Sequence, residues 1–394
     1  MTRSTSLGGR QFFLDWVRVL AFALLIFYHT GMMFVSWDFH IESGHDSELL
    51  KSIMMLSSSW RLDILFLVSG VAISFMISKM SLRHFASQRV IKLLIPFLFA
   101  VVVVVAPQAY FEALHKGVYE GGFWEFWTSQ YFSFSWPEKM LAPFPTYNHM
   151  WYVLYLFAYT LLLLPLFNYI NSERGQRRLA LMEHWLIRGR RVIWLPILIY
   201  CFILICSNST EITHAFYNDA YGHAIYLFAL LMGLLFVRMP LVWQAFENHR
   251  HTSLVIALIG YSLLLTERYF FPVEYGVEFL GMIIKWSWMT TILGYAKRYL
   301  NSSNSWLEYA SQAVYPFFIL HQTVIIVIGY FIIDLGFSWI AEFVIIALGT
   351  FLICGLIFEG CIKRLNILKL MFGLKYTPFL SLKKPLLRNG AKQT

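Results

Sequence analysis

The amino-acid sequence predicts an all-α fold: one polytopic membrane bundle of about ten transmembrane helices, with the N- and C-termini both cytoplasmic. Composition is the first reason, because hydrophobic residues make up 58% of the 394 residues and charged residues only 13%. Soluble domains carry about 25% charged residues. A chain with so few polar groups cannot cover a globular surface in water, so lipid must be its solvent.

Hydropathy is the second reason, because a helix needs ~20 apolar residues to cross ~30 Å of hydrocarbon. The first apolar run keeps Asp15, Arg18 and His29 and lacks a small-residue cleavage site. We therefore expect a retained helix there rather than a cleaved signal peptide. The expected spans lie near 13–36, 54–78, 91–110, 149–170, 191–207, 221–239, 252–268, 277–296, 312–334 and 340–362.

The distribution of basic residues is the third reason, and it predicts the orientation. Lys and Arg fill alternate loops such as 79–92 and 171–191, whereas the loops 37–53 and 208–220, which alternate with them along the chain, are acidic. The positive-inside rule makes the basic loops cytoplasmic. The excess of 31 Lys and Arg over 22 Asp and Glu therefore reflects membrane topology, and we expect a lipid bilayer but no nucleic acid as partner.

The sequence predicts one domain and a short tail. Residues 1–375 form a single integral membrane domain, and residues 376–394 form a basic cytoplasmic tail. The aromatic segment 111–148 is explained equally by a belt at the lipid headgroups and by a re-entrant segment or lid. The four cysteines lie in or beside apolar runs without a C-x-x-C pair, so we expect neither a metal site nor a redox motif.

The first helix carries three ionisable residues, which are costly in a bilayer and are therefore candidates for function. Arg18 and His29 are eleven residues apart, which at ~100° per residue is three turns plus about 20°. They share one face, about 16 Å apart along the axis. Asp15 lies one turn before Arg18 and can pair with it. The alternatives are that Arg18 reaches the headgroups and that His29 makes one interhelical hydrogen bond.

Further polar residues interrupt the later apolar runs. A small polar pair, Ser69 and Gly70, lies in the middle of the second expected helix, where helix packing is as good an explanation as substrate binding. The other candidates are Asp63 in the second helix, His149 and Trp151 at the start of the fourth, His321 in the ninth and Glu359 near the inner end of the tenth.

Together these residues give the sequence a resemblance to the acyltransferase family 3 of integral membrane acyltransferases, and within it most to the glucan biosynthesis protein C group. The resemblance covers nearly the whole chain, and its motifs occur in the family's order. The Arg-x-x-Arg pair of the family is Arg89 and Lys92 here, which keeps the charge but loses bidentate phosphate recognition. The matching segments are Leu14–Arg18 with His29, Asp63–Gly70, Arg89–Lys92 before Pro96, His149–Tyr152, Tyr315–Gln322, Phe358–Glu359 and Leu368–Phe372.

The resemblance implies a membrane-bound O-acyltransferase in the bacterial inner membrane. It implies transfer of an acyl group from cytoplasmic acyl-coenzyme A, either succinyl-CoA or acetyl-CoA. The implied acceptor is a hydroxyl of a periplasmic glucan, a surface polysaccharide or lipopolysaccharide. Acyl-CoA is then a co-substrate, and no bound cofactor is expected.

The resemblance also assigns roles that suit the residue types. His29 is the expected general base, because imidazole titrates near neutral pH. Arg18 and Asp15 complete the catalytic set, and Arg89 and Lys92 suit the phosphates of coenzyme A. The remaining substrate-binding candidates are Asp63, Ser69, His149, Trp151, His321 and Glu359, of which His149 and Glu359 are also candidates to orient His29.

Two other function classes stay open from the sequence. A transporter also carries ionisable residues inside a helix bundle, although no repeated pair of broken helices is evident in the two halves. A non-catalytic protein of glycan or envelope assembly is the second alternative. Consumption of acyl-CoA distinguishes an enzyme from both.

Overall fold

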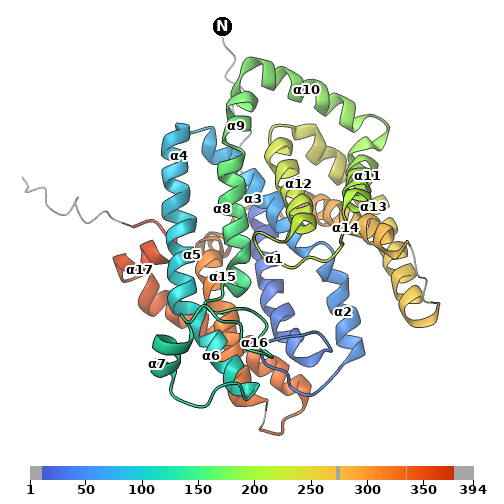
Figure 1. Ribbon diagram of the computed structural model, residues 1–394. Coiled ribbons are helices and arrows are strands. Elements are labelled where there is room, and N and C mark those ends of the chain that lie inside the picture. Colours follow the sequence, from blue (N-terminus) through green and yellow to red (C-terminus); the bar gives the residue numbers. More distant parts are fainter. Residues whose placement is uncertain (1–10, 272–275, 334, 377–394) are drawn as a thin grey trace, which may run out of the picture.

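The structure is a computed structural model that describes residues 11–271, 276–333 and 335–376, and over these residues it contains helices and no strand (Figure 1). It confirms the all-α membrane fold predicted from composition and hydropathy. The expected tail falls almost wholly on residues 377–394, outside the described part of the chain.

Seven helical spans in the described chain are long and apolar enough to cross a membrane, or eight when a bent pair is counted as one span. Each of the ten expected runs is helical. The two that do not meet this measure are α12 (Ala220–Phe236), which is 17 residues long, and α14 (Val277–Tyr299), which carries Lys285 in its middle.

The remaining helices follow the order of the expected runs, and several spans are built from consecutive pieces. The bent pair is α8 and α9, which meet at 53°, and Pro165 lies in the first turn of the second piece. The bounds are α1 (Phe12–Gly31), α2 (Glu48–Ser58), α3 (Arg61–Ile77), α4 (Leu82–Arg89), α5 (Ile95–Phe99), α6 (Ala106–His115), α7 (Phe123–Glu125), α8 (Trp151–Leu162), α9 (Leu164–Asn171), α10 (Glu173–Ile187), α11 (Arg191–Cys206), α13 (Pro240–Phe270), α15 (Ser305–Ile332), α16 (Trp339–Ile357) and α17 (Asn366–Met371).

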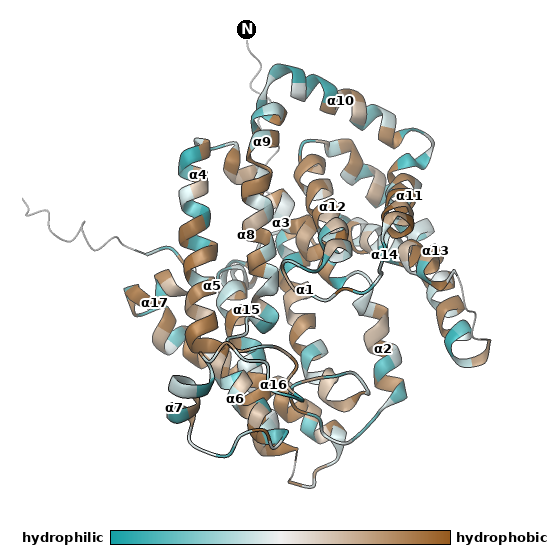
Figure 2. Ribbon diagram, in the orientation of Figure 1, coloured by the Kyte–Doolittle hydropathy of each residue, from teal (hydrophilic) through white to brown (hydrophobic). Residues whose placement is uncertain are grey.

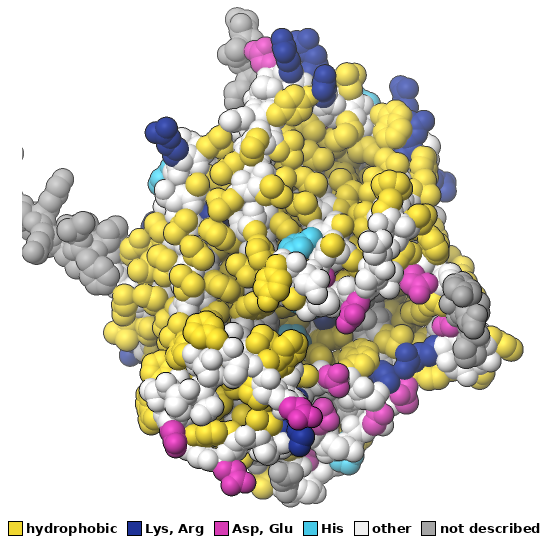
Figure 3. Space-filling model, in the orientation of Figure 1, with side chains coloured by type: hydrophobic (Ala, Val, Ile, Leu, Met, Phe, Trp, Pro, Cys, Tyr) yellow, Lys and Arg dark blue, Asp and Glu magenta, His cyan; other side chains and the backbone are white. Residues whose placement is uncertain are grey.

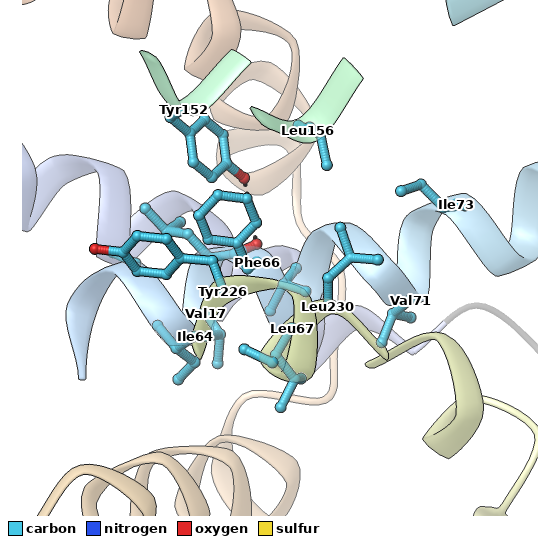
Figure 4. Packing of buried hydrophobic residues seen from close by; sticks show 14 of the residues in the cluster. Val17, Ile64, Phe66, Leu67, Val71, Ile73, Tyr152, Leu156, Tyr226 and Leu230 are labelled. Atoms are coloured by element: carbon cyan, nitrogen blue, oxygen red, sulfur yellow. Dashed lines mark hydrogen bonds between the residues drawn. The ribbon is translucent and has the colours of Figure 1, made fainter. Parts of the chain in front are cut away.

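Helix α1 lies inside the bundle and packs against α3, α14, α15 and α16. Helices α3 and α12 approach most closely where each has a glycine. A Cβ at Gly70 would lie 2.0 Å from the carbonyl oxygen of Leu230, and a Cβ at Gly233 would lie 1.8 Å from that of Leu67. Gly70 is therefore a packing residue. Figure 4 shows the resulting core, with the Phe66 ring stacked on Tyr226 at 4.8 Å.

The two ends of the bundle differ in charge. A hydrophobic band separates them in Figure 2. Lys and Arg side chains gather over α4 and α10 at the top of Figure 3, whereas Asp and Glu side chains gather in its lower half. This distribution agrees with the alternation of charge along the sequence. The assignment of the basic end to the cytoplasm stays a prediction.

Candidate active site

The ionisable strip of α1 is the starting point of the site. Arg18 and Asp15 form an ion pair with an N–O distance of 3.2 Å, which confirms the pairing expected from their spacing. His29 lies near the other end of the helix and is partly exposed. Nothing in α1 itself contacts the His29 ring nitrogens through a hydrogen bond, so the partner must come from another helix.

That partner is His321 of α15. The Nε2 atom of His321 lies 3.2 Å from the Nδ1 atom of His29, and the two rings are stacked with centroids 5.1 Å apart. The Nδ1 atom of His321 lies 2.7 Å from the carbonyl oxygen of Phe318. His321 is 1% exposed. Two residues expected at one site are therefore in direct contact, although 292 positions separate them in the chain.

His149 joins this pair from the start of the α8 span. Its ring meets the His321 ring edge-on at 5.1 Å, and its Nε2 atom lies 3.1 Å from the carbonyl oxygen of Ile319. The amide of Gln108 lies 3.4 Å from the other ring nitrogen of His149 and also donates to Thr323. His149 thus contacts His321 rather than His29, and Gln108 is a neighbour that the sequence analysis did not single out.

A second set of buried polar side chains lies beside these rings, on the side away from the basic end of the bundle. Gln322 lies 2.9 Å from Nε2 of His40, and Nδ1 of His40 lies 2.5 Å from a carboxylate oxygen of Glu112. The other oxygen of Glu112 accepts from Lys116 at 3.0 Å and from the backbone N–H of Leu141 at 2.8 Å. These contacts among Gln322, His40 and Glu112 were not predicted from the sequence. The available signal was Glu112, an acidic residue in an apolar helix.

Arg61 lies beside the site without a counter-ion among the described residues. It is 6% exposed, and its guanidinium lies over the Tyr28 ring, 3.3 Å from the centroid. Its Nε and Nη1 atoms are buried and have no hydrogen-bond partner in the described chain. The Arg61 charge is close enough to His29 and His214 to interact with both electrostatically. An uncompensated buried cation in a bilayer is costly, so this position has a functional explanation by default.

Asp63, two residues further along α3, is fully compensated. Its carboxylate accepts from Lys285 at 2.9 Å and from the Tyr200 hydroxyl at 3.1 Å. Both charged side chains are buried. The expected substrate-binding residue Asp63 therefore joins α3, α11 and α14 through a buried ion pair.

The basic residues expected to bind phosphates lie together at the other end of the bundle. Arg89 is buried, and its Nη2 atom donates only to the sulfur of Met76, while Nε has no partner among the described residues. Lys92 lies within electrostatic reach of Arg89 and Lys375. The Tyr315 hydroxyl, which interacts electrostatically with Arg89, is also buried without a partner in the described chain.

An apolar cavity of about 170 Å³ runs between α1, α15 and α16 and reaches His321. Its lining includes Trp306 and Tyr309 near the start of α15 and Phe22 on α1. Trp306 and His321 are fifteen residues apart, which is about 22 Å along a helix at ~1.5 Å per residue. The cavity therefore extends from the first turns of α15 to the histidine pair.

Ser69, Trp151 and Glu359 also lie outside the group of contacting histidines. Ser69 hydrogen-bonds the Tyr152 hydroxyl at 2.7 Å, and Trp151 stacks on the His214 ring at 3.9 Å. Glu359 is exposed and pairs with Lys363 at 2.8 Å.

Glu359 was one of two residues expected to orient His29, and the structure does not bring them together. Helix α16 begins at Trp339, whose ring packs on Phe34 a few residues after His29. Glu359 follows the opposite end of that helix, about 30 Å along the axis at ~1.5 Å per residue. The residue that contacts His29 is His321.

Within the described residues, no group of three or more His, Cys, Asp or Glu side chains has a geometry that could hold a metal ion. The imidazoles of the site face one another and backbone carbonyls instead. This arrangement suits proton transfer by a partly exposed imidazole.

Comparison with known proteins agrees with the motifs. A family profile described as an acyltransferase domain matches residues 11–359. Curated relatives named glucans biosynthesis protein C, from Escherichia coli O157:H7 (strain EC4115 / EHEC), O6:K15:H31 (strain 536 / UPEC) and strain K12, are each 24% identical over 372 residues. These alignments cover 89% of this chain and 88% of each relative. No solved structure matches the chain. The chain is a multi-pass membrane protein that belongs to the acyltransferase 3 family.

Proposed function

We propose that this protein is a membrane-bound O-acyltransferase that moves a succinyl or acetyl group from cytoplasmic acyl-CoA to a hydroxyl of a periplasmic or surface glycan. The observation that carries the proposal is the His29–His321 pair at the end of an apolar cavity. The family supports acyl transfer, and the relatives' name supports a glucan acceptor. The proposed location is the bacterial inner membrane, with both termini cytoplasmic, because basic loops alternate with acidic ones along the chain.

The reaction needs one base and no covalent enzyme intermediate. His29 accepts the proton of the acceptor hydroxyl as its oxygen attacks the carbonyl carbon of the thioester. The carbon–sulfur bond breaks, and the electron pair leaves on the sulfur of coenzyme A. His29 then returns the proton to that sulfur. The products are the glycan ester and free coenzyme A.

The donor enters from the basic end of the bundle. Arg89 and Lys92 bind the phosphates of coenzyme A, since Arg89 is buried with a guanidinium nitrogen that has no protein partner in the described chain. The thioester arm lies in the apolar cavity along α15 and brings the carbonyl carbon to His29. Arg18, paired with Asp15 near the cavity, supports the donor on the way.

Arg61 favours succinyl over acetyl as the acyl group. A succinyl group ends in a carboxylate, and Arg61 is a buried cation near His29 without a counter-ion among the described residues. A carboxylate bound there compensates a charge that the protein leaves uncompensated. Lys285 is also a buried cation, but it is already paired with Asp63.

The acceptor approaches from the acidic end. Figure 3 shows this face hollowed between the outer loops and α2, with charged side chains around the hollow. Trp151, His149 and the segment 111–148 lie on this side and are the expected contacts for the glycan, because aromatic rings and hydrogen-bonding groups suit a sugar. Ser69 and Asp63 support the helices behind them.

The test is mass spectrometry of surface and periplasmic glycans from cells that express wild type, His29→Ala or the control His84→Ala, whose parent residue is an exposed histidine of α4. We expect the mass increment of one acyl group with wild type and with the control, and none with His29→Ala at equal protein level. The increment identifies the acyl group.

Two results would contradict the proposal. Persistence of the increment in His29→Ala would exclude His29 as the base. An absent increment in wild type, together with no release of free coenzyme A from membranes given acyl-CoA and glycan, would favour transport or assembly instead.

A further inference from the structure

Both ring nitrogens of His321 are engaged, and this fixes where its proton lies. The Nδ1 atom faces the Phe318 carbonyl oxygen at 2.7 Å. A carbonyl can only accept, so Nδ1 carries the hydrogen. A second proton would put a charge on a ring that is 1% exposed and has no carboxylate in hydrogen-bond contact among the described residues. A neutral His321 therefore presents a lone pair at Nε2.

The lone pair of His321 in turn fixes the proton of His29. The Nδ1 atom of His29 lies 3.2 Å from Nε2 of His321. Since Nε2 accepts, Nδ1 of His29 is the donor. A neutral imidazole has a single N–H, so the lone pair of His29 is at Nε2. Among the described residues, no hydrogen bond reaches this nitrogen.

His149 packs against the His29–His321 pair but takes no part in the hydrogen bond between them. Its Nε2 atom faces the Ile319 carbonyl at 3.1 Å, and its Nδ1 atom faces the Gln108 amide. Its ring contacts His321 edge-on. Two successive carbonyls of α15, those of Phe318 and Ile319, therefore fix the tautomers of two neighbouring imidazoles.

We infer that His321 is a positioning residue, which orients His29 and holds its proton on Nδ1 so that Nε2 is the base. This inference rests on the proposed function for its catalytic consequence. When His29 takes the proton of the acceptor, its Nδ1–H bond to His321 becomes charge-assisted and stronger. His321 then does for His29 what a carboxylate does for the histidine of a serine protease triad.

Among the described residues, no carboxylate near His29 is available for this role. The groups that interact electrostatically with it are His321 on α15, Arg61 on α3, His149 before α8 and His40 in the loop after α1. Three are imidazoles and one is a permanent cation. A neutral imidazole acceptor is thus the group that stabilises the protonated base.

The experiment compares His321→Met with His321→Gln in purified, detergent-solubilised protein. Gln can present an amide oxygen near the position of Nε2, whereas Met cannot accept a strong hydrogen bond. We expect kcat to fall by about 10²-fold or more in His321→Met, the scale of general-base effects, with little change in KM for acyl-CoA. We expect partial recovery of kcat in His321→Gln and a displaced pH profile in both.

A second measurement tests the His29–His321 hydrogen bond independently of turnover and of the folding of the His321 variants. Nitrogen-15 NMR of wild-type protein labelled at histidine, with His29 assigned by its loss in His29→Ala, reports which His29 nitrogen carries hydrogen. We expect hydrogen on Nδ1. Hydrogen on Nε2, or wild-type kcat in a folded His321→Met when His29→Ala is inactive, would overturn the inference. If the wild-type protein is inactive but carries hydrogen on Nδ1 of His29, the proposed function is refuted, whereas the orientation of His29 by His321 is still supported.

Discussion

The buried ion pair between Asp63 and Lys285 allows a sharp test of whether Asp63 is structural. The two charged atoms are 2.9 Å apart, and the side chains are 3% and 9% exposed. Removing one partner of such a pair leaves an uncompensated buried charge, at a cost of about 3–5 kcal/mol. Replacing both partners by apolar residues of similar volume is often nearly neutral.

We therefore expect Lys285→Met and Asp63→Leu each to lower the free energy of unfolding by about 3–5 kcal/mol. The double variant should lose much less than the sum, because neither charge is then left alone. The hydroxyl of Tyr200, which donates to Asp63 at 3.1 Å, loses its partner in two of the three variants and contributes about 1 kcal/mol to their cost.

The assay is a double-mutant cycle on unfolding in detergent, followed by acyl transfer at a temperature where all the proteins are folded. A coupling of several kcal/mol with activity retained in the double variant would make Asp63 a structural residue. Additive losses would refute the reasoning from the ion pair. A stable double variant without activity would indicate that Asp63 takes part in substrate binding.

Three further outcomes are expected. Gly70→Ala should lower the free energy of unfolding in detergent by about 3 kcal/mol or more, because the added methyl group overpacks against a backbone oxygen. Gly281→Ala, with open space around it, should leave that free energy nearly unchanged. Equal losses of stability in the two variants would refute the close approach of α3 and α12. Arg61→Met should lower kcat/KM for succinyl-CoA far more than for acetyl-CoA in a coenzyme A release assay, and an equal loss for both donors would contradict a carboxylate contact. Burial lowers the pKa of His214 to about 4, below the ordinary value of about 6.5. Between these values the unfolded loop binds a proton that the folded loop does not, so the stability of the loop should fall as pH drops from about 6.5 towards 4. Hydrogen exchange in 208–219 measures this stability, and the same fall in His214→Phe would exclude His214 as its cause.

The positions of the helices could be predicted from the sequence because hydropathy and charge act locally. Each expected apolar run is helical, and the spacing of Asp15 and Arg18 predicted their ion pair. The breaks inside spans were harder to predict. The bend between α8 and α9 lies next to Pro165, but the hydropathy of a segment does not distinguish a bent span from a straight one.

The site was predictable in its residue types but not in its pairings. His29 and His321 were both candidates, yet their contact spans 292 positions and depends on the register of α1 against α15. Glu359 was a plausible partner for His29 by type alone, and only the direction of α16 separates them. Gln108 and His40 were missed because a single amide or loop histidine carries no periodic signal.

The bilayer offers a physical criterion that separates structural from functional polar residues in this bundle. Without water, each polar group must find a partner in the protein or pay for its burial. Asp63 with Lys285, and His40 with Glu112, are closed sets whose charges and hydrogen bonds are satisfied internally. Arg61 and the Nε2 atom of His29 are open in the described chain. A residue left open at such a cost is where a substrate should supply the missing partner, so Arg61 and His29, rather than Asp63, are the positions at which substitution should change what the enzyme transfers.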